Sequence, residues 1–258
     1  MQKIFLRMIL LRLTHYHRKI ILMRLNKYLA LSGVASRRMS DDLIKAATTT
    51  VNDIVITDPA FNVKKDDVVR YDGKNIKINQ KHIVLMFNKP LGVITTMYDP
   101  KNRPAIADYF PKRMRLFPIG RLDKNTSGLL LVTNNGNLAN KLMHPKNLIP
   151  KIYEAETDLL LDAVLTAKIK KGVFIGYNQW AKAIIINQKR IKSRIKVLLQ
   201  LHHGKNREIR RLFYKLNRKL YSLKRVKYGD LELGNLPIGK FRELNKIELN
   251  KVQKSLKF

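Results

Sequence analysis

Cysteine is absent from the 258-residue chain, acidic residues are scarce, and tryptophan occurs once. The absence of cysteine excludes disulfides and thiolate metal sites, and it is compatible with a reducing compartment. Only 19 acidic residues stand against 52 lysines and arginines, so the formal net charge is +33. Such an excess of positive charge favours a polyanionic partner, with nucleic acid ahead of an acidic membrane surface.

Long apolar segments are also missing. After Met23 no uninterrupted apolar stretch is long enough to cross a membrane, which argues against a stable membrane partner. Hydrophobic residues make up 45% of the chain, as expected of a folded globular protein. The length allows one large domain or two domains that each bury a core. His144, His202 and His203 lack the spacing of a ligand set, so we expect no metal site.

Residues 1–22 differ from the rest of the chain because they are basic, apolar and free of acids. Two interpretations fit this composition. The segment is either an organelle-targeting peptide or the product of an upstream start, with Met23 as the true initiator. We favour the second interpretation and expect a cytoplasmic protein, while organelle targeting stays open.

The pattern from residue 23 to residue 72 predicts a small module of two helices and a few strands. Residues 24–33 have helical spacing, with Gly33 suited to a C-terminal cap, and Ser36 is placed to cap a second helix. Three short β-rich runs follow, at Thr48–Val51, Ile54–Thr57 and Val68–Tyr71. We expect the polar residues 73–82 to form a linker.

A larger mixed domain is predicted over residues 83–250, followed by a basic tail at 251–258. Residues 194–201 alternate between apolar and polar side chains, which indicates a strand with one buried face. The other strand candidates are Ile83–Phe87, Val93–Met97, Leu129–Thr133, Ile152–Thr157 and Ala181–Ile186. Helices are predicted at Leu138–His144, Leu160–Lys171 and Arg207–Leu216.

Two groups of charged residues could carry chemistry. Asp123 lies in a glycine-bracketed turn between Arg121 and Lys124, just before an apolar run. A turn aspartate in a solvated charge cluster is the simplest interpretation of that peptide taken alone. The small module carries Arg24, Lys27, Arg37 and Arg38. The last two stand at the start of the second helix, where backbone N–H groups favour a phosphate, although a solvated helix face is the plain alternative.

Residues 24–30, 32–38 and 43–44 resemble the small RNA-binding module named after small-subunit ribosomal protein S-four. That family usually carries glycine at the end of the second helix and in the hairpin turn, where this chain has Ala47 and Asp53. Alanine in a left-handed cap costs roughly 1 kcal/mol. We therefore expect this corner to be built differently.

Four further motifs follow in order. They are Asn88-Lys89-Pro90-Leu91-Gly92, Gly120 to Gly128, Lys151-Ile152-Tyr153, and Gly204 to Leu212. Together with the leading module they resemble a ribosomal RNA pseudouridine synthase of the RsuA/RluB type, from Met23 to about Leu249. The resemblance implies an isomerase of the α+β class, whose catalytic domain has a mainly antiparallel β-sheet. It also implies that the reaction needs no metal and no organic cofactor.

The same resemblance implies a catalytic trio. Asp123 matches the catalytic carboxylate, acting either as a nucleophile or as a base at the sugar. Arg210 matches its ion-pair partner, because a guanidinium favours the ionised carboxylate. Tyr153 matches the ring that stacks on the flipped uracil. Taken alone, Arg210 could instead bind phosphate or be solvated, and Tyr153 could be an ordinary strand tyrosine.

Arg121 matches a contact to RNA beside the flipped nucleotide, while Lys89, Pro90 and Gly92 are expected to shape the pocket wall. The full set of RNA-binding candidates is Arg121, Arg24, Lys27, Arg37, Arg38, Arg207 and Arg211. The motifs at 99–104, 142–145 and 206–212 look closer to the branch that modifies the large subunit. We therefore expect a monomer acting on large-subunit ribosomal RNA or a ribosome assembly intermediate.

Three alternatives remain open. The target could be small-subunit ribosomal RNA, or the protein could be a non-catalytic RNA-binding scaffold on the ribosome. It could also be a membrane-surface protein held by residues 1–22.

Overall fold

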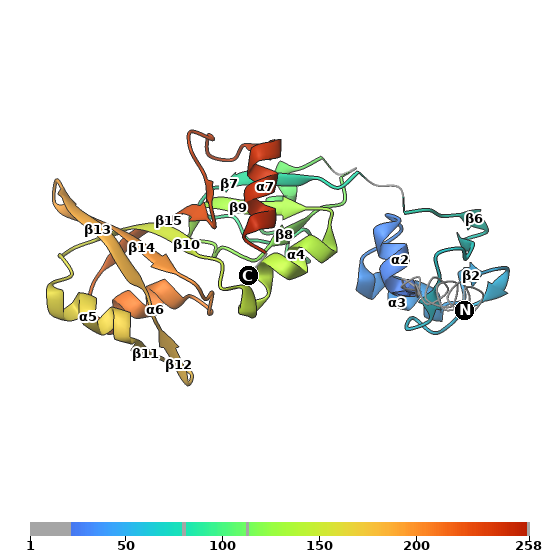
Figure 1. Cartoon of the computed structure of the whole chain (residues 1–258), viewed down its shortest axis with the longest axis horizontal. Helices are drawn as coiled ribbons and strands as arrows, with labels where there is room; N and C mark the ends of the chain where they lie inside the picture. The colour runs from blue at the N-terminus through green and yellow to red at the C-terminus, as the bar shows by residue number, and fades with distance from the viewer. Residues whose placement is uncertain (1–21, 79–80, 112–113, 257–258) are drawn as a thin grey trace, which may run out of the picture. The chain divides into compact units, whose positions relative to one another are not determined.

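The computed structural model describes residues 22–78, 81–111 and 114–256. The predictions made for residues 1–21 lie outside these ranges. The chain divides into two compact units, residues 1–81 and 82–258, and each is described by itself (Figure 1). None of the helices in the described ranges is long and apolar enough to cross a membrane.

The first unit contains the two predicted helices and several short strands. Helices α2 (Leu25–Leu31) and α3 (Arg37–Lys45) lie side by side (Figure 1). A four-stranded antiparallel sheet has the order β3–β2–β5–β6, with bounds Ile54–Val55, Thr49–Val51, Val69–Tyr71 and Lys74–Asn75. Strands β1 (Met23–Arg24) and β4 (Asn62–Val63) form a separate pair. The core consists of Leu25, Leu29, Ile44, Val51, Val63 and Val69.

The ends of α3 show one prediction confirmed and one corrected. Ser36 caps the helix as predicted, because its hydroxyl accepts a hydrogen bond from the Met39 N–H at 3.2 Å. Ala47 nevertheless adopts the left-handed conformation, with φ of 58°. The expectation of a different corner is therefore wrong. Hydrogen bonds hold the turn despite the alanine, since the Ala47 N–H donates to the Ile44 carbonyl at 3.0 Å.

Two predicted boundaries also need correction. Strand β6 falls inside the stretch assigned to a linker at 73–82, because a turn folds residues 74–75 back onto β5. The Tyr28 hydroxyl then donates to the Ile76 carbonyl at 3.1 Å, so the ordered module extends past residue 72. At the other end of the chain, helix α7 (Lys246–Lys254) enters the predicted tail at 251–258, where burial of Val252 continues the helix.

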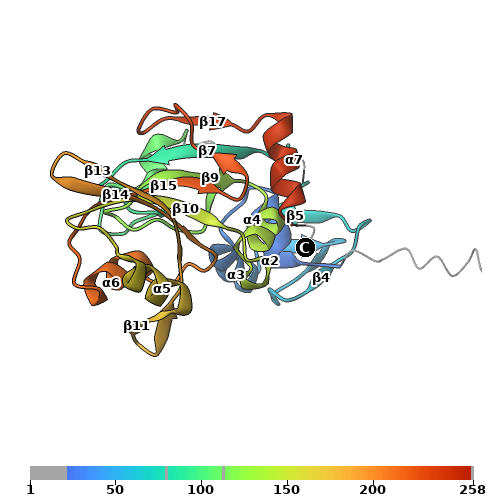
Figure 2. The same cartoon turned by 60° about the vertical axis from the view of Figure 1, so that its left-hand side comes forward.

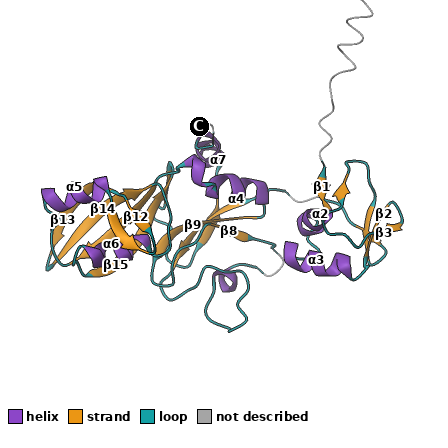
Figure 3. Cartoon of the chain, turned by 90° about the horizontal axis from the view of Figure 1, so that it is seen from below, coloured by secondary structure: helices purple, strands orange, loops and turns teal. Residues whose placement is uncertain are grey.

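The second unit is built on a nine-stranded sheet. Its main order is β13–β14–β10–β15–β9–β7–β17, with β16 paired to β15 and β8 paired to β9. The bounds are Val84–Lys89 (β7), Phe117–Ile119 (β8), Ser127–Thr133 (β9), Lys151–Thr157 (β10), Ile184–Ile191 (β13), Arg194–Leu201 (β14), Leu220–Tyr228 (β15), Leu231–Glu232 (β16) and Phe241–Glu243 (β17). All its pairings are antiparallel except β9 with β15, which confirms the predicted mainly antiparallel sheet. Figure 3 draws the strands in orange and the helices in purple.

Helices cover the two ends of this sheet. Helix α4 (Gly136–Met143) and α7 lie at the β7–β9 end, and α5 (Ala163–Lys171) and α6 (Glu208–Lys215) lie at the β13–β14 end (Figures 1 and 2). A separate hairpin of β11 (Val173–Gly176) and β12 (Gln179–Ala181) packs against α6. The short 3-10 helices are η1 (Ile106–Tyr109) and η2 (Pro145–Asn147). Residues 195, 197, 199 and 201 of β14 are buried, so the predicted alternation is confirmed.

Three predicted elements differ from the structure. Residues 93–97 form no strand beyond one bridge from Ile94 to Ala105, because the backbone turns there, with the Thr96 N–H donating to the Ile94 carbonyl at 3.1 Å. The run predicted at 181–186 is divided between β12 and β13, since the backbone leaves β12 at Ala181 and starts β13 at Ile184. Helix α5 begins at Ala163 and not at residue 160, because the Asp162 carboxylate caps it by accepting from the Leu165 N–H at 2.7 Å.

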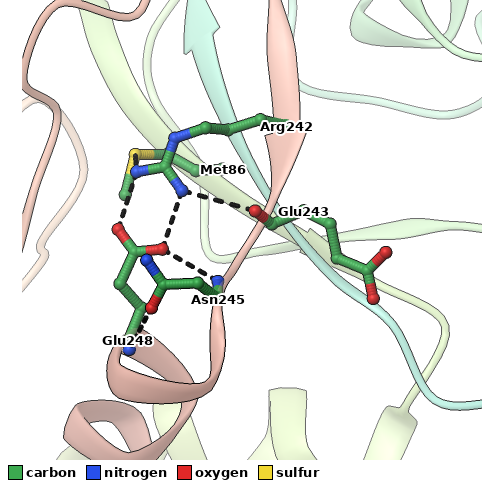
Figure 4. Close-up of polar contacts among 5 residues, drawn as sticks. All are labelled: Met86, Arg242, Glu243, Asn245 and Glu248. Atoms are coloured by element: carbon green, nitrogen blue, oxygen red, sulfur yellow. Dashed lines mark hydrogen bonds and ion pairs between the residues drawn. The ribbon is translucent and has the colours of Figure 1, made fainter.

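The last strand and the last helix are fastened to each other by a charged pair (Figure 4). The Arg242 guanidinium donates to the two carboxylate oxygens of Glu248 at 2.6 and 2.7 Å. This hydrogen bonding lowers the pKa of Glu248 and raises that of Arg242. The Asn245 side chain accepts from the Glu248 N–H at 2.9 Å and so caps α7. The pair fixes α7 against the edge strand β17.

Candidate active site

Strand β15 joins the two halves of the sheet and is the last long strand in the sequence. On one side it pairs with β10, antiparallel, and on the other side it pairs with β9, parallel. At the parallel pairing Gly128, with φ of 103°, faces Arg225. A Cβ atom at Gly128 would lie 2.2 Å from the Arg225 carbonyl oxygen. Only glycine allows this approach, which sets where the loop carrying Asp123 meets the sheet.

The backbone on either side of Asp123 is held by the segment that follows β7. The Thr95 hydroxyl donates to the Leu122 carbonyl at 2.6 Å and accepts from the Leu122 N–H at 3.2 Å. The Gly92 N–H donates to the Lys124 carbonyl at 2.9 Å. Because the residues before and after it are both hydrogen-bonded, the half-buried Asp123 is presented in one orientation.

Asp123, Tyr153 and Arg210 line the same pocket, together with Arg121 and Arg207. The three come from the loop before β9, from β10 and from α6. Tyr153 lies between two hydrophobic clusters, one under α5 and α6 and one around Phe87 and Phe110, and packs against both. The structure thus brings together residues that are far apart in the sequence, as the motifs predict.

The predicted ion pair between Arg210 and Asp123 is not formed within 4.0 Å. Instead the Arg210 guanidinium donates to the Asn125 carbonyl and, at 3.4 Å, to the Thr126 hydroxyl. The loop turns the Asn125 carbonyl and the Thr126 hydroxyl toward α6. These two oxygens therefore accept the Arg210 hydrogen bonds that the Asp123 carboxylate was expected to accept. Burial lowers the pKa of Arg210, the Arg207 charge lowers it further, and the Asp123 charge opposes both.

Lys89 brings a second positive charge near Asp123. Its side chain is completely buried, and its ammonium group donates to the carbonyls of Pro90 and Val93 at 2.9 and 2.6 Å. Burial lowers the pKa of Lys89 to about 8, against the opposing effect of the Asp123 carboxylate. Lys89 is not among the residues that line the pocket, so its expected place in the pocket wall stays a prediction, while its charge acts on Asp123 electrostatically.

Glu208 is buried in the lining of the pocket, and the half-buried Lys151 interacts with it electrostatically. The Glu208 carboxylate accepts from the Lys205 N–H at 2.9 Å, and its other oxygen has no hydrogen-bond partner. The Lys151 ammonium donates to the carbonyls of Ile149 and His202. Burial and the Arg225 charge lower the pKa of Lys151 to about 8, while Glu208 acts in the opposite direction.

Sequence reasoning missed two of these residues. Glu208 had a usable signal, because it is the only acid between Asp162 and Asp230. An acid in so basic a stretch, at the start of a helix with a strong apolar stripe, indicates a capping role. Thr95 had no signal, since its importance comes from a contact with a segment 27 residues away.

The remaining RNA-binding candidates lie in three places. Arg121 and Arg207 are exposed at the pocket. Arg211 points away from it, because its guanidinium donates to the Gln179 side chain and lies 5.5 Å from the Tyr177 ring centre. Arg24, Arg37 and Arg38 are exposed on the first unit, and Lys27 is half-buried there. Among the described residues no three His, Asp or Glu side chains form a group that could hold a metal ion.

Comparison with known protein families fits this architecture. The RNA pseudouridylate synthase family matches residues 83–215, and the S4 domain matches residues 23–69. The chain therefore belongs to the RNA pseudouridylate synthase family, carries an N-terminal S4 domain, and is an isomerase acting on RNA.

Individual relatives are similar over most of their length. The chain is 37% identical to ribosomal large subunit pseudouridine synthase B of Bacillus subtilis, covering 89% of this chain and 95% of the relative. It is 35% identical to an uncharacterized RNA pseudouridine synthase of Aquifex aeolicus, covering 90% and 94%. A crystal structure of a pseudouridylate synthase has the same fold, with a TM-score of 0.64 at 22% identity over 89% of this chain and 99% of that chain.

Proposed function

We propose that the protein converts a uridine of large-subunit ribosomal RNA into pseudouridine, with Asp123 as the catalytic carboxylate. The observation that carries this proposal is the convergence of Asp123, Tyr153 and Arg210 on one pocket. The choice of the large subunit is supported by the name and the 37% identity of the Bacillus subtilis relative.

The reaction breaks the bond between C1′ and N1 of the uridine and rejoins the ring through C5. The proton on C5 is lost and N1 gains one, so the product is an isomer of the substrate. An ionised Asp123 starts the reaction, either by attacking C1′ or by removing a proton from the sugar. In both routes the loop held by Thr95 and Gly92 supplies orientation before the substrate arrives.

Tyr153 and Arg210 have different roles in this scheme. The Tyr153 ring is fixed between two hydrophobic clusters and offers a flat surface for a uracil that has left its stack, a step that costs a few kcal/mol. Arg210 is a positioning residue, because it holds the Asn125 carbonyl of the catalytic loop.

Affinity comes from contacts to phosphates. Arg121 and Arg207 stand at the rim of the pocket, where the backbone of a flipped nucleotide would pass. In the S4 domain the candidates are Arg24, Lys27, Arg37 and Arg38. Such binding falls steeply as salt concentration rises. We further propose that the protein acts in the cytoplasm, as a monomer, on ribosomal RNA or an assembly intermediate.

Mapping pseudouridines in ribosomal RNA from cells with and without the protein tests the proposal. We expect one site, or very few, to be lost from the large subunit and restored by the wild-type protein. Asp123→Asn should restore none while the purified variant still binds RNA. Asp230→Asn, at an exposed turn outside the pocket, is the matched control and should restore the site.

Two results would contradict the proposal in different ways. Restoration by Asp123→Asn would remove Asp123 from the catalytic role. A lost site in small-subunit RNA would leave the enzyme class intact and overturn only the target.

A further inference from the structure

The β11–β12 hairpin carries aromatic side chains into solvent. Tyr177 is 87% exposed, Trp180 56% and Phe174 46%. The Phe174 and Trp180 rings meet edge to face, with centres 5.7 Å apart. Figures 1 and 2 show the hairpin projecting beyond α6 from the body of the second unit. A clustered set of exposed aromatic rings marks an interaction site more often than single exposed apolar residues do. We call Phe174, Tyr177 and Trp180 the aromatic platform.

Two cations contact the hairpin that carries the aromatic platform, and the sequence around it is poor in acids. The Arg211 guanidinium lies 5.5 Å from the Tyr177 ring centre and also donates to the Gln179 side chain. The Lys205 ammonium donates to the Trp180 carbonyl. The only acid between Asp162 and Asp230 is Glu208, which is 5% exposed. The platform thus combines flat rings with adjacent positive charge, which is the combination that suits single-stranded nucleic acid.

The aromatic platform is continuous with the candidate active site. Lys205 contacts Trp180 and also lines the pocket that contains Asp123. Helix α6 directs Arg210 toward that pocket and the adjacent Arg211 toward the hairpin. Lys205 and α6 therefore link the pocket, where the target nucleotide would lie, to the platform.

We propose that the aromatic platform binds unpaired RNA bases next to the target uridine, by stacking on Tyr177 and Trp180. Lys205 and Arg211 would hold the phosphates between those bases and the pocket. The inference rests on the proposed function, because it takes the pocket to hold a nucleotide of RNA. Stacking tolerates any base, so the platform selects for an unpaired strand and not for its sequence.

The single tryptophan makes the proposal directly measurable. Because Trp180 is the only tryptophan of the chain, tryptophan fluorescence, excited at a wavelength that the tyrosines do not absorb, reports on the platform alone. The full-length Asp123→Asn protein is titrated with a short single-stranded RNA and with an abasic strand of equal length and charge. We expect the RNA to quench Trp180 and the abasic strand to bind without quenching. Equal quenching by the two strands would overturn the stacking proposal.

The RNA affinity of alanine variants also tests whether the platform stacks on RNA bases. Tyr177→Ala and Trp180→Ala should each weaken RNA binding roughly 10-fold, within the range expected for one lost stacking contact. Tyr177 is at the exposed tip, so its substitution does not disturb the core. Tyr221→Ala is the matched control: Tyr221 is also partly exposed and lies under a guanidinium, that of Arg194, at the far end of β15. Unchanged affinity in Tyr177→Ala and Trp180→Ala would overturn the proposal.

Failure of this proposal and failure of the proposed function are distinguishable. Quenching is measured in a variant that does not turn over, so it does not depend on isomerisation. If the wild-type protein makes no pseudouridine but RNA still quenches Trp180, only the enzymatic proposal fails. If pseudouridine forms while RNA leaves Trp180 unquenched and both alanine variants bind normally, only the platform proposal fails.

Discussion

The loop around Asp123 and the corner after α3 both contain left-handed backbone, yet they differ in what they tolerate. At Gly128 a Cβ atom would lie 2.2 Å from the Arg225 carbonyl oxygen, so a side chain is excluded. At the corner, Ala47 adopts φ of 58° with a side chain in place. The difference indicates that a left-handed residue can carry a side chain at an open corner but not where its Cβ would meet the backbone of a paired strand.

The two regions also differ in where the hydrogen bonds that fix them come from. Thr95 and Gly92 hold the residues on both sides of Asp123, and Arg210 holds Asn125. The corner depends mainly on bonds back to its own helix, from the Ala47 N–H to Ile44 and from the Thr48 hydroxyl to Leu43. The catalytic loop is thus fixed by distant segments, and the corner by local ones.

The largest effect is expected from Gly128→Ala. The added methyl group forces β9 away from β15 and strains the backbone, for a combined cost of about 3–5 kcal/mol. Thermal unfolding should show a large fall in Tm or little soluble protein. Gly204→Ala is the control, since Gly204 has no positive φ and no atom near its Cβ position. A Gly128→Ala protein as stable as Gly204→Ala would show that β9 and β15 can accommodate a side chain at this position.

Thr95→Val should reduce catalysis more than stability. Without the hydroxyl the Leu122 backbone loses two hydrogen bonds and Asp123 loses its orientation, so kcat should fall roughly 10- to 100-fold with little change in KM. Thr95→Ser should recover most of the rate. Thr96→Val removes the exposed contacts to Tyr98 and should leave kcat unchanged. Equal losses in the Thr95 and Thr96 variants would contradict a specific role for Thr95.

The buried Lys89 should make the stability of the folded protein depend on pH. Its pKa is lowered to about 8 in the folded protein, below the ordinary lysine value of 10.5. Between these values the unfolded chain binds more protons, so stability gains with rising pH, by at most about 1.4 kcal/mol per pH unit. Measured from pH 7 to 10, the stability of the wild type relative to Lys89→Met should improve above about pH 8. A difference that stays constant with pH would mean that the Lys89 pKa is not lowered.

The smallest effect is expected in the corner of the S4 domain. Ala47→Gly removes the cost of a left-handed alanine and should stabilise the protein by about 0.5–1 kcal/mol. Ala46→Gly is the control, because Ala46 has φ of −76° and gains nothing from glycine. Chemical denaturation of both variants measures the contrast. A destabilised Ala47→Gly protein would show that the alanine side chain contributes contacts that outweigh the strain.

Patterns that depend on neighbouring residues were predictable from the sequence. The alternation in 194–201 gave β14, and Ser36 marked the start of α3. Residues 93–97 and 181–186 were misassigned, because β-branched residues favour strands locally while turns imposed by distant packing interrupt them. The sequence motifs also predicted that Asp123, Tyr153 and Arg210 share one site, and the three residues line one pocket. Their roles stay predictions.

Contacts between distant segments account for what the sequence could not reveal. Nothing in the peptide around Thr95 points to Leu122, and the direction of the Arg210 side chain depends on how the catalytic loop turns its carbonyl groups. The aromatic platform was missed for a similar reason. Tyrosine and tryptophan are also common in protein cores, so the sequence does not show that Tyr177 and Trp180 are exposed. Their exposure follows from how the hairpin packs on α6.

The central position of β15 has a consequence for protein synthesis. Tyr153 belongs to β10, and Asp123 precedes β9, but these strands are joined only through β15 at residues 220–228. A chain that is still being made therefore carries Asp123 and Tyr153 long before it can assemble them. Assembly of the pocket therefore waits until residues 220–228 have been made and can pair with both β9 and β10.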